Sequence, residues 1–349
     1  MLIRLLKADL ARGRAVAAVL LALVSLAVTL ASASASLIID TVSATHRLSE
    51  RARVPDLVQM HSGEVDSHAI AQWADSLADV EDYMVMRTLP VPRAQLSIAG
   101  ALQDASYLEP AFVTAPERID LLLDENGERV LPDQGQVYLP IHYKAAGIAE
   151  AGDTVTVDTG QWRIDLLVAG FLRDAQMNAA MVPSKRLVVN PADFATLDEH
   201  MTELEYLIEF DLADGASAAA VSEQYKAAGL PSAGIAITAS QIQLMNALST
   251  MLIAAVALVV AGVLAAVSVL SLRYTVLAAL ETDLPQVAVL KAIGAPQAGI
   301  RRLYLLKYAV IAAVGGGVGY ALSRPLASSL LAPTTLYLGT PQRDRKSVV

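Results

Sequence analysis

The chain has 349 residues, of which 54% are hydrophobic and only 17% are charged. Soluble domains carry about 25% charged residues, so this composition indicates a membrane protein. The sequence contains no cysteine, which excludes a disulfide framework, a thiol nucleophile and a cysteine metal site. It also contains no GxxxxGK[ST] segment, so we expect no ATP hydrolysis by a P-loop in this chain.

The net charge of −9 combines two regions of opposite sign. Residues 37–243 carry 31 of the 35 acidic side chains and 13 of the 26 basic ones, a net charge of −18. The rest of the chain has a net charge of +9, and its basic residues flank apolar segments. By the positive-inside rule these flanks predict a multi-pass protein of the cell membrane with a cytoplasmic N-terminus. The acidic region then lies outside the cytoplasm.

Residues 1–14 form a basic amphipathic segment that we expect to lie on the cytoplasmic membrane surface. Residues 15–39 carry no charge and are long enough to span a bilayer as a first transmembrane helix. A cleaved signal peptide is the alternative, because a basic start, an apolar core and the small residues 31–35 also fit that pattern. The length of the apolar run favours a helix that is retained.

Residues 40–243 read as one α+β domain inserted between two membrane helices. Alternating apolar residues predict strands, and apolar residues at three- and four-residue spacing predict helices. The expected strands cover residues 54–60, 80–89, 121–123, 137–140, 152–157, 162–168, 205–212 and 235–238. The expected helices cover residues 67–78 and 216–228.

Residues 244–272 are uncharged and predict a second transmembrane helix that leaves the domain without a flexible linker. Residues 273–302 are expected to form a cytoplasmic loop with a short amphipathic helix. Asp283 is a suitable N-cap, Pro285 suits the first turn, and Gly294 suits the position after the last turn. Val287, Leu290 and Ile293 fall on one face of this helix.

Residues 303–323 predict a third transmembrane helix, preceded by Arg301 and Arg302. Gly315 and Gly319 within it have the small-xxx-small spacing that allows a second helix to approach closely. The alternative role for these glycines is local helix flexibility. Lys291 also has two readings, a surface lysine that extends its charge into water or a contact with an acidic groove on a partner.

The segment VAVLKAIGAPQAGIRRLYLLKY, followed by the glycine cluster, resembles the conserved membrane segment of the FtsX-like permease family. That family includes the membrane subunits of MacB-type ABC transporters. Residues 137–147, 152–155 and 168–170 resemble strands of the MacB-like periplasmic core domain. The resemblance implies α-helical transmembrane segments with a large extracytoplasmic α+β domain between the first and second helices.

The resemblance also implies a function and partners. The chain would be a non-enzymatic permease subunit that couples ATP hydrolysis by a separate cytoplasmic ABC ATPase to movement of the external domain. Export, extraction and mechanotransmission all fit. The implied partners are the ATPase, the lipid bilayer and either a second permease copy or a missing C-terminal half, with no nucleic acid and no cofactor. The residues implied to contact the ATPase are Pro285, Val287, Leu290, Lys291, Ile293, Gly294, Arg301 and Arg302.

Two further expectations complete this reading. Family members place a fourth helix after the third, so residues 324–349 read as a truncated or artefactual tail. The five histidines lack the spacing of zinc ligands, so no metal site is expected. The alternative function is a membrane-anchored sensor or binding module that transports nothing. An anchor would not need the amphipathic helix around Leu290.

Overall fold

The computed structural model describes residues 14–179, 182–292 and 297–339. These residues form two compact units. The helical unit contains the described residues up to Asp40 and those between Thr250 and Ala332. The α+β unit contains Thr41–Ser249 and the described residues from Pro333 onward.

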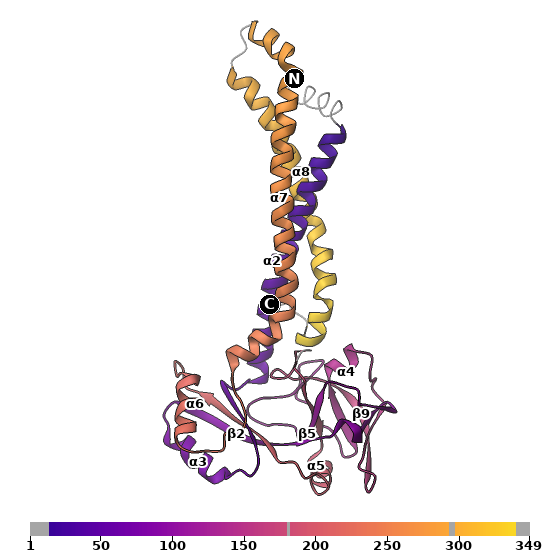
Figure 1. The fold of residues 1–349 in the computed structure, drawn as a ribbon, viewed down its shortest axis with the longest axis vertical. Helices are drawn as coiled ribbons and strands as arrows, with labels where there is room; N and C mark the ends of the chain where they lie inside the picture. The colour runs from indigo at the N-terminus through magenta and orange to yellow at the C-terminus, as the bar shows by residue number, and fades with distance from the viewer. Residues whose placement is uncertain (1–13, 180–181, 293–296, 340–349) are drawn as a thin grey trace, which may run out of the picture. The chain divides into compact units, whose positions relative to one another are not determined.

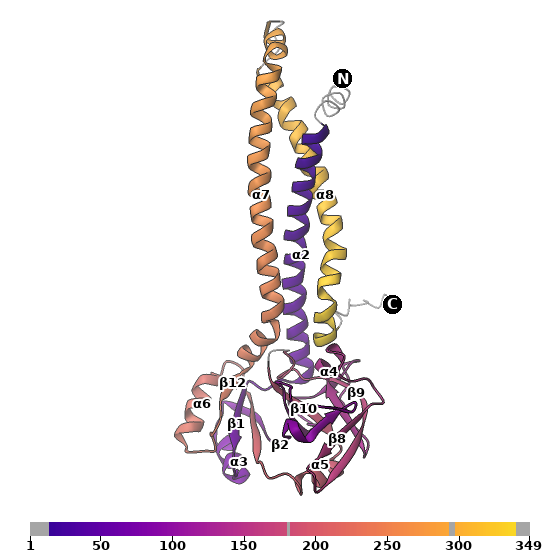
Figure 2. The same ribbon diagram turned by 45° about the vertical axis from the view of Figure 1, so that its right-hand side comes forward.

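Three long helices carry the apolar segments: α2 (Arg14–Ala52), α7 (Ala239–Ala292) and α8 (Gln297–Leu338). Within the described residues, each contains a stretch long and apolar enough to cross a membrane. The three helices run side by side in both ribbon views (Figures 1 and 2). The α+β unit lies in the sequence between the first and second of them. The predicted fold class, membrane helices with a large inserted α+β domain, is therefore confirmed.

The helices are longer than the sequence predicted. The helix α7 passes through Asp283 and Pro285 without a break, so the expected helix start at Asp283 is wrong. The preceding residues 275–282 contain no glycine or proline and favour continuation. The helix accommodates Pro285, although an interior proline removes one backbone hydrogen bond and crowds the carbonyl four residues before it. Similarly, α8 continues past Ser323 to Leu338, so the first part of the expected tail is helical.

A single 12-stranded sheet organises the α+β unit, in the order β12-β1-β11-β2-β5-β10-β7-β9-β8-β3-β4, with β6 paired to β9. The strands are β1 (Leu57–Ser62), β2 (Val80–Pro90), β3 (Leu96–Ile98), β4 (Ala101–Leu102), β5 (Glu109–Thr114), β6 (Leu123–Asp124), β7 (Gln136–Pro140), β8 (Thr154–Asp158), β9 (Arg163–Arg173), β10 (Ser184–Val189), β11 (Glu205–Leu212) and β12 (Ala236–Thr238). The short helices are α3 (Ser67–Ser76), α4 (Ile141–Ala145), α5 (Pro191–Asp198), α6 (Ala218–Ala227) and the 3-10 turn η1 (Arg93–Gln95).

The long strand β2 joins two halves of the sheet. Its first part pairs antiparallel with β11, and its last residues pair with β5. On the β1–β11 side, α3 and α6 pack around a core that includes Ile70, Phe210 and Tyr225 (Figure 2). The other half has its own core and contains two parallel pairs, β5 with β10 and β7 with β9.

Candidate functional site

One loop of the α+β unit contacts the segments of all three long helices that belong to this unit. We call residues 174–179, which follow β9 and precede β10, the junction loop. Its Ala175 carbonyl accepts a hydrogen bond from Asn246 Nδ2 of α7 at 2.7 Å. Its Asn178 Nδ2 donates to the Tyr337 carbonyl of α8 at 2.6 Å. Ala175 also packs in an apolar cluster with Ala44, Leu48 and Ala52 of α2 and Leu338 of α8.

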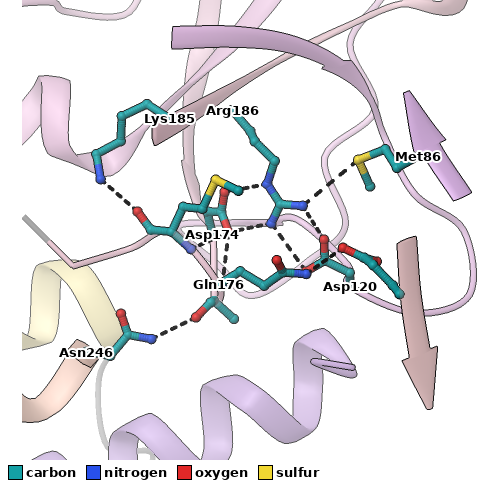
Figure 3. A network of polar contacts seen from close by, with 10 residues as sticks. Met86, Asp120, Asp174, Gln176, Lys185, Arg186 and Asn246 are labelled. Carbon is teal, nitrogen blue, oxygen red and sulfur yellow. Dashed lines mark hydrogen bonds and ion pairs between the residues drawn. The ribbon is translucent and has the colours of Figure 1, made fainter. Parts of the chain in front are cut away.

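A buried arginine holds this loop in place. Arg186 of β10 is the largest fully buried side chain among the described residues. Its Nε donates to Asp174 Oδ2 at 2.7 Å, and its Nη2 donates to Asp174 Oδ1. Figure 3 shows the same guanidinium between Asp174 and Asp120, with Nη1 donating to Asp120 Oδ2. Paired, two-point contacts of this kind are the strongest that arginine makes with carboxylates.

The two carboxylates connect Arg186 to different helices. Asp174 Oδ1 also accepts the backbone N–H groups of Gln176 and Met177, at 3.0 and 2.9 Å, which fixes the turn of the junction loop. The backbone N–H of Asp120 donates to the carbonyl of Arg53, the residue after α2, at 2.8 Å. Arg186 therefore links the end of α2, through Asp120, to the loop that contacts α7 and α8.

The positive and negative charges in this network are equal in number when Glu209 of β11 is neutral. Burial, followed by the negative charge of Asp120, raises the pKa of Glu209 well above its ordinary range. Gln176 Nε2 donates to Glu209 Oε1 at 2.7 Å. Burial lowers the pKa of Lys185 to about 8, and the charge of Asp174 opposes that effect. With Glu209 protonated, Arg186 lies between the carboxylates of Asp120 and Asp174, and Asp174 also attracts the Lys185 ammonium.

We expect Glu209→Gln to stabilise the protein increasingly as pH rises from 5 to 8. A raised pKa means that the folded state keeps a proton that the unfolded state releases above about pH 4.5. Stability of the wild type therefore falls as pH rises toward the folded pKa, by at most about 1.4 kcal/mol per pH unit, and glutamine removes this loss. The measurement is the thermal unfolding of both proteins across that pH range. Glu223→Gln, at an exposed side chain, is the control; a constant offset for Glu209→Gln would contradict the prediction.

In the helical unit, the structure places Gly315 and Gly319 against α2. A Cβ on Gly319 would lie 2.5 Å from the Ser25 carbonyl oxygen and 2.9 Å from Val28 Cβ. A Cβ on Gly315 would lie 3.1 Å from Val24 Cγ1. Thr29 Oγ1 lies 3.1 Å from the Gly319 carbonyl oxygen, to which it donates. The two glycines thus face the α2 backbone at close range.

The remaining predicted site residues lie near the break between α7 and α8. Pro285, Val287, Leu290 and Lys291 belong to α7, and Arg301 and Arg302 belong to α8. Ile293 and Gly294 lie outside the described residues. The junction loop and Arg186 were not predicted. One feature of the sequence could have indicated them, the pair of adjacent cations Lys185 and Arg186 near the start of an apolar strand.

Comparison with known proteins bears on the helical part of the chain. The family model described as FtsX-like permease C-terminal matches residues 258–341. This part of the chain is similar to the FtsX-like permease family. The match covers most of α7 and all of α8, and it reaches into the segment that the sequence analysis assigned to a tail. It fits a multi-pass membrane permease of the ABC transporter type.

Two other comparisons give little information about the fold or the function of this chain. The periplasmic region of MacB from Actinobacillus actinomycetemcomitans is similar in part, with 9% identity over 56% of this chain and 94% of that chain. Its TM-score of 0.32 is too low to carry an argument about fold or function. No curated protein matches the chain.

Proposed function

We propose that this FtsX-like permease is the transmembrane subunit of an ABC transporter that moves its α+β unit when a separate cytoplasmic ATPase turns over. The family match over α7 and α8 supports the transporter class. The contacts that α2, α7 and α8 make with the junction loop support the movement, because a shift of any of these helix segments displaces the same six residues. Export, extraction and mechanotransmission would all use such a displacement.

The proposed orientation places the N-terminus and the α7–α8 break in the cytoplasm and the α+β unit outside. The support is the charge difference between the acidic unit and the basic flanks of the apolar segments. The membrane is then the plasma or inner membrane.

We expect single cysteines to report this orientation cleanly, because the chain has no cysteine of its own. Gln161→Cys, in the exposed turn between β8 and β9, should react with a membrane-impermeant maleimide added to intact cells or spheroplasts. Gln297→Cys, at the start of α8, should react only after the membrane is permeabilised. The reverse pattern would invert the topology.

The proposed contact with the ATPase is the segment around the α7–α8 break, with Leu290 at the centre of its apolar stripe. Burying one leucine contributes roughly 1.5–3 kcal/mol, which corresponds to more than tenfold in affinity. We expect Leu290→Asp to abolish co-purification with the cognate ATPase and stimulation of its ATP turnover in nanodiscs. Ala288→Asp is the matched control, because it adds the same charge two residues away, on the opposite face of the helix.

The outcome separates the two function classes. Normal ATPase binding by Leu290→Asp, in protein that inserts and melts like the wild type, would remove this segment as the coupling element. The membrane-anchored sensor or binding module would then be the better description. Loss of binding in Leu290→Asp but not in Ala288→Asp supports the permease.

A further inference from the structure

A small cavity of about 70 Å³ lies in the α+β unit between α2, the turn after β6 and the end of α8. We call it the arginine pocket, because its lining includes Arg47 and Arg51 of α2 and Arg173 of β9. The rest of the lining is Leu48, residues 123–127 and the two residues Leu338 and Gly339. Three arginines from two elements therefore line one small cavity.

Two carboxylates also line the pocket, but other groups already occupy them. Asp124 Oδ1 accepts the backbone N–H groups of Asn126 and Glu128, both at 2.8 Å. Glu125 accepts both of its short hydrogen bonds from Lys144 Nζ, at 2.7 and 2.9 Å. These contacts reduce the capacity of both acids to neutralise the arginines.

One of these arginines has a buried donor without an acceptor. Arg47 Nη2 is shielded from solvent and has no hydrogen-bond partner among the described residues. Arg173 donates to three backbone carbonyls, those of Leu336, Asp124 and Glu125, rather than to a carboxylate. Leaving a buried charged donor without an acceptor is unfavourable, so the site favours a ligand that brings acceptor oxygens and negative charge.

We propose that the arginine pocket binds a phosphate-class anion, either the phosphate of a lipid headgroup or free phosphate. The planar donors of arginine match the oxygens of a phosphate group better than those of lysine would. The volume is well below the ~300–1,000 Å³ of pockets for drug-sized ligands, so it suits a single tetrahedral group rather than a transported molecule. This inference does not depend on the proposed transport function.

The position of Arg47 along α2 favours free phosphate over a headgroup as the source. Arg47 follows Ile39, the last residue of the uncharged run, by eight residues, or about 12 Å of helix. The polar zone of a bilayer extends the ~30 Å apolar core to about 40–45 Å, which adds only about 5–7.5 Å on each side. An anion held at this height on the helix would anchor α2 beside the turn after β6.

The test uses the full-length protein with two anion sources. In detergent, inorganic phosphate should raise the melting temperature of the wild type in a concentration-dependent manner. Arg47→Gln should require roughly tenfold more phosphate for the same shift, as expected for the loss of one charged contact. Arg163→Gln, which removes an exposed arginine paired with Asp165, should respond like the wild type. Arg47→Lys keeps the positive charge but loses the planar set of donors of arginine. This variant should need a phosphate concentration between those of the wild type and Arg47→Gln.

Nanodiscs distinguish the two sources. If phosphatidylglycerol, compared with phosphatidylcholine, raises the melting temperature of the wild type but not of Arg47→Gln, the ligand is a lipid headgroup. If inorganic phosphate stabilises the protein and the anionic lipid adds nothing, the ligand is free phosphate. The proposal is overturned if neither source stabilises the wild type, or if Arg47→Gln and Arg47→Lys both respond as the wild type does.

Discussion

Replacing Arg186 with leucine is expected to destabilise the α+β unit by about 3–5 kcal/mol, because the change leaves Asp120 and Asp174 buried without their cation. Both carboxylates are almost fully buried, at 0% and 1% exposure, so water cannot replace the lost donors. The same change frees the junction loop, since Asp174 loses the guanidinium that fixes it. Thermal unfolding of the full chain in detergent measures the effect. If the chain unfolds in one two-state transition, the shift in melting temperature can be converted into a change in the free energy of unfolding.

The matched control is Arg163→Leu. Arg163 also pairs with an aspartate, Asp165, but both side chains are exposed, at 60% and 49%. Exposed ion pairs contribute about 0–1 kcal/mol, so this variant should melt close to the wild type. Equal shifts for the two arginines would show that the buried network does not hold the unit together. A stable Arg186→Leu protein that also keeps full ATPase stimulation would remove the junction loop from the proposed mechanism.

Gly319→Leu should break the pairing of α8 with α2 and abolish any activity that needs an intact helical unit. Even a single Cβ at this position would overlap the Ser25 carbonyl, a backbone atom that cannot move aside like a flexible side chain. Overpacking in a tight core costs about 1–3 kcal/mol, and a backbone clash places this variant at or above the upper end. The measurements are the melting temperature in nanodiscs and the stimulation of ATP turnover by the partner.

Gly316→Leu tests whether the effect is specific. Gly316 lies in the same helix and the same glycine cluster, yet nothing lies within 4 Å of a Cβ placed on it. The two substitutions have the same chemistry and nearly the same position along α8. Normal behaviour of Gly316→Leu with failure of Gly319→Leu would assign the cluster to helix packing. Failure of both would favour a requirement for flexibility in this part of α8.

Local patterns in the sequence predicted many local elements of the α+β unit, but they missed the strands β3, β4, β5 and β10 and the helix α5. The strand β11 has the predicted bounds, Glu205–Leu212, and α3 begins at the predicted Ser67. The hairpin of β8 and β9 was also predicted, because alternation and a Gly-containing turn both lie within a short window. These features depend on neighbours along the chain.

Long-range features were not predictable in the same way. The strands β5 and β10 pair in parallel although they lie far apart in sequence, and no turn signal joins them. The buried network was not predicted, because nothing local in the sequence tells a paired buried arginine from a solvated one. Helix ends were also misjudged. Asp283 and Pro285 suggested a helix start, and the third membrane helix was expected to end at Ser323, but α7 and α8 run through these positions without a break.

The contacts of Arg173 and Asn178 with α8 have a consequence for biosynthesis. Their acceptors are the carbonyls of Leu336 and Tyr337, whereas most of the α+β unit ends at Ser249. At about 5–20 residues per second, the ribosome adds the intervening segment over roughly 5–20 s. During that interval the junction loop of the nascent unit lacks its contacts with α8. These contacts form only after the last turn of α8 has been synthesised. The α+β unit can therefore complete its folding only after the third membrane helix has been synthesised. A nascent chain stalled before α8 would expose the junction loop to chaperones and proteases.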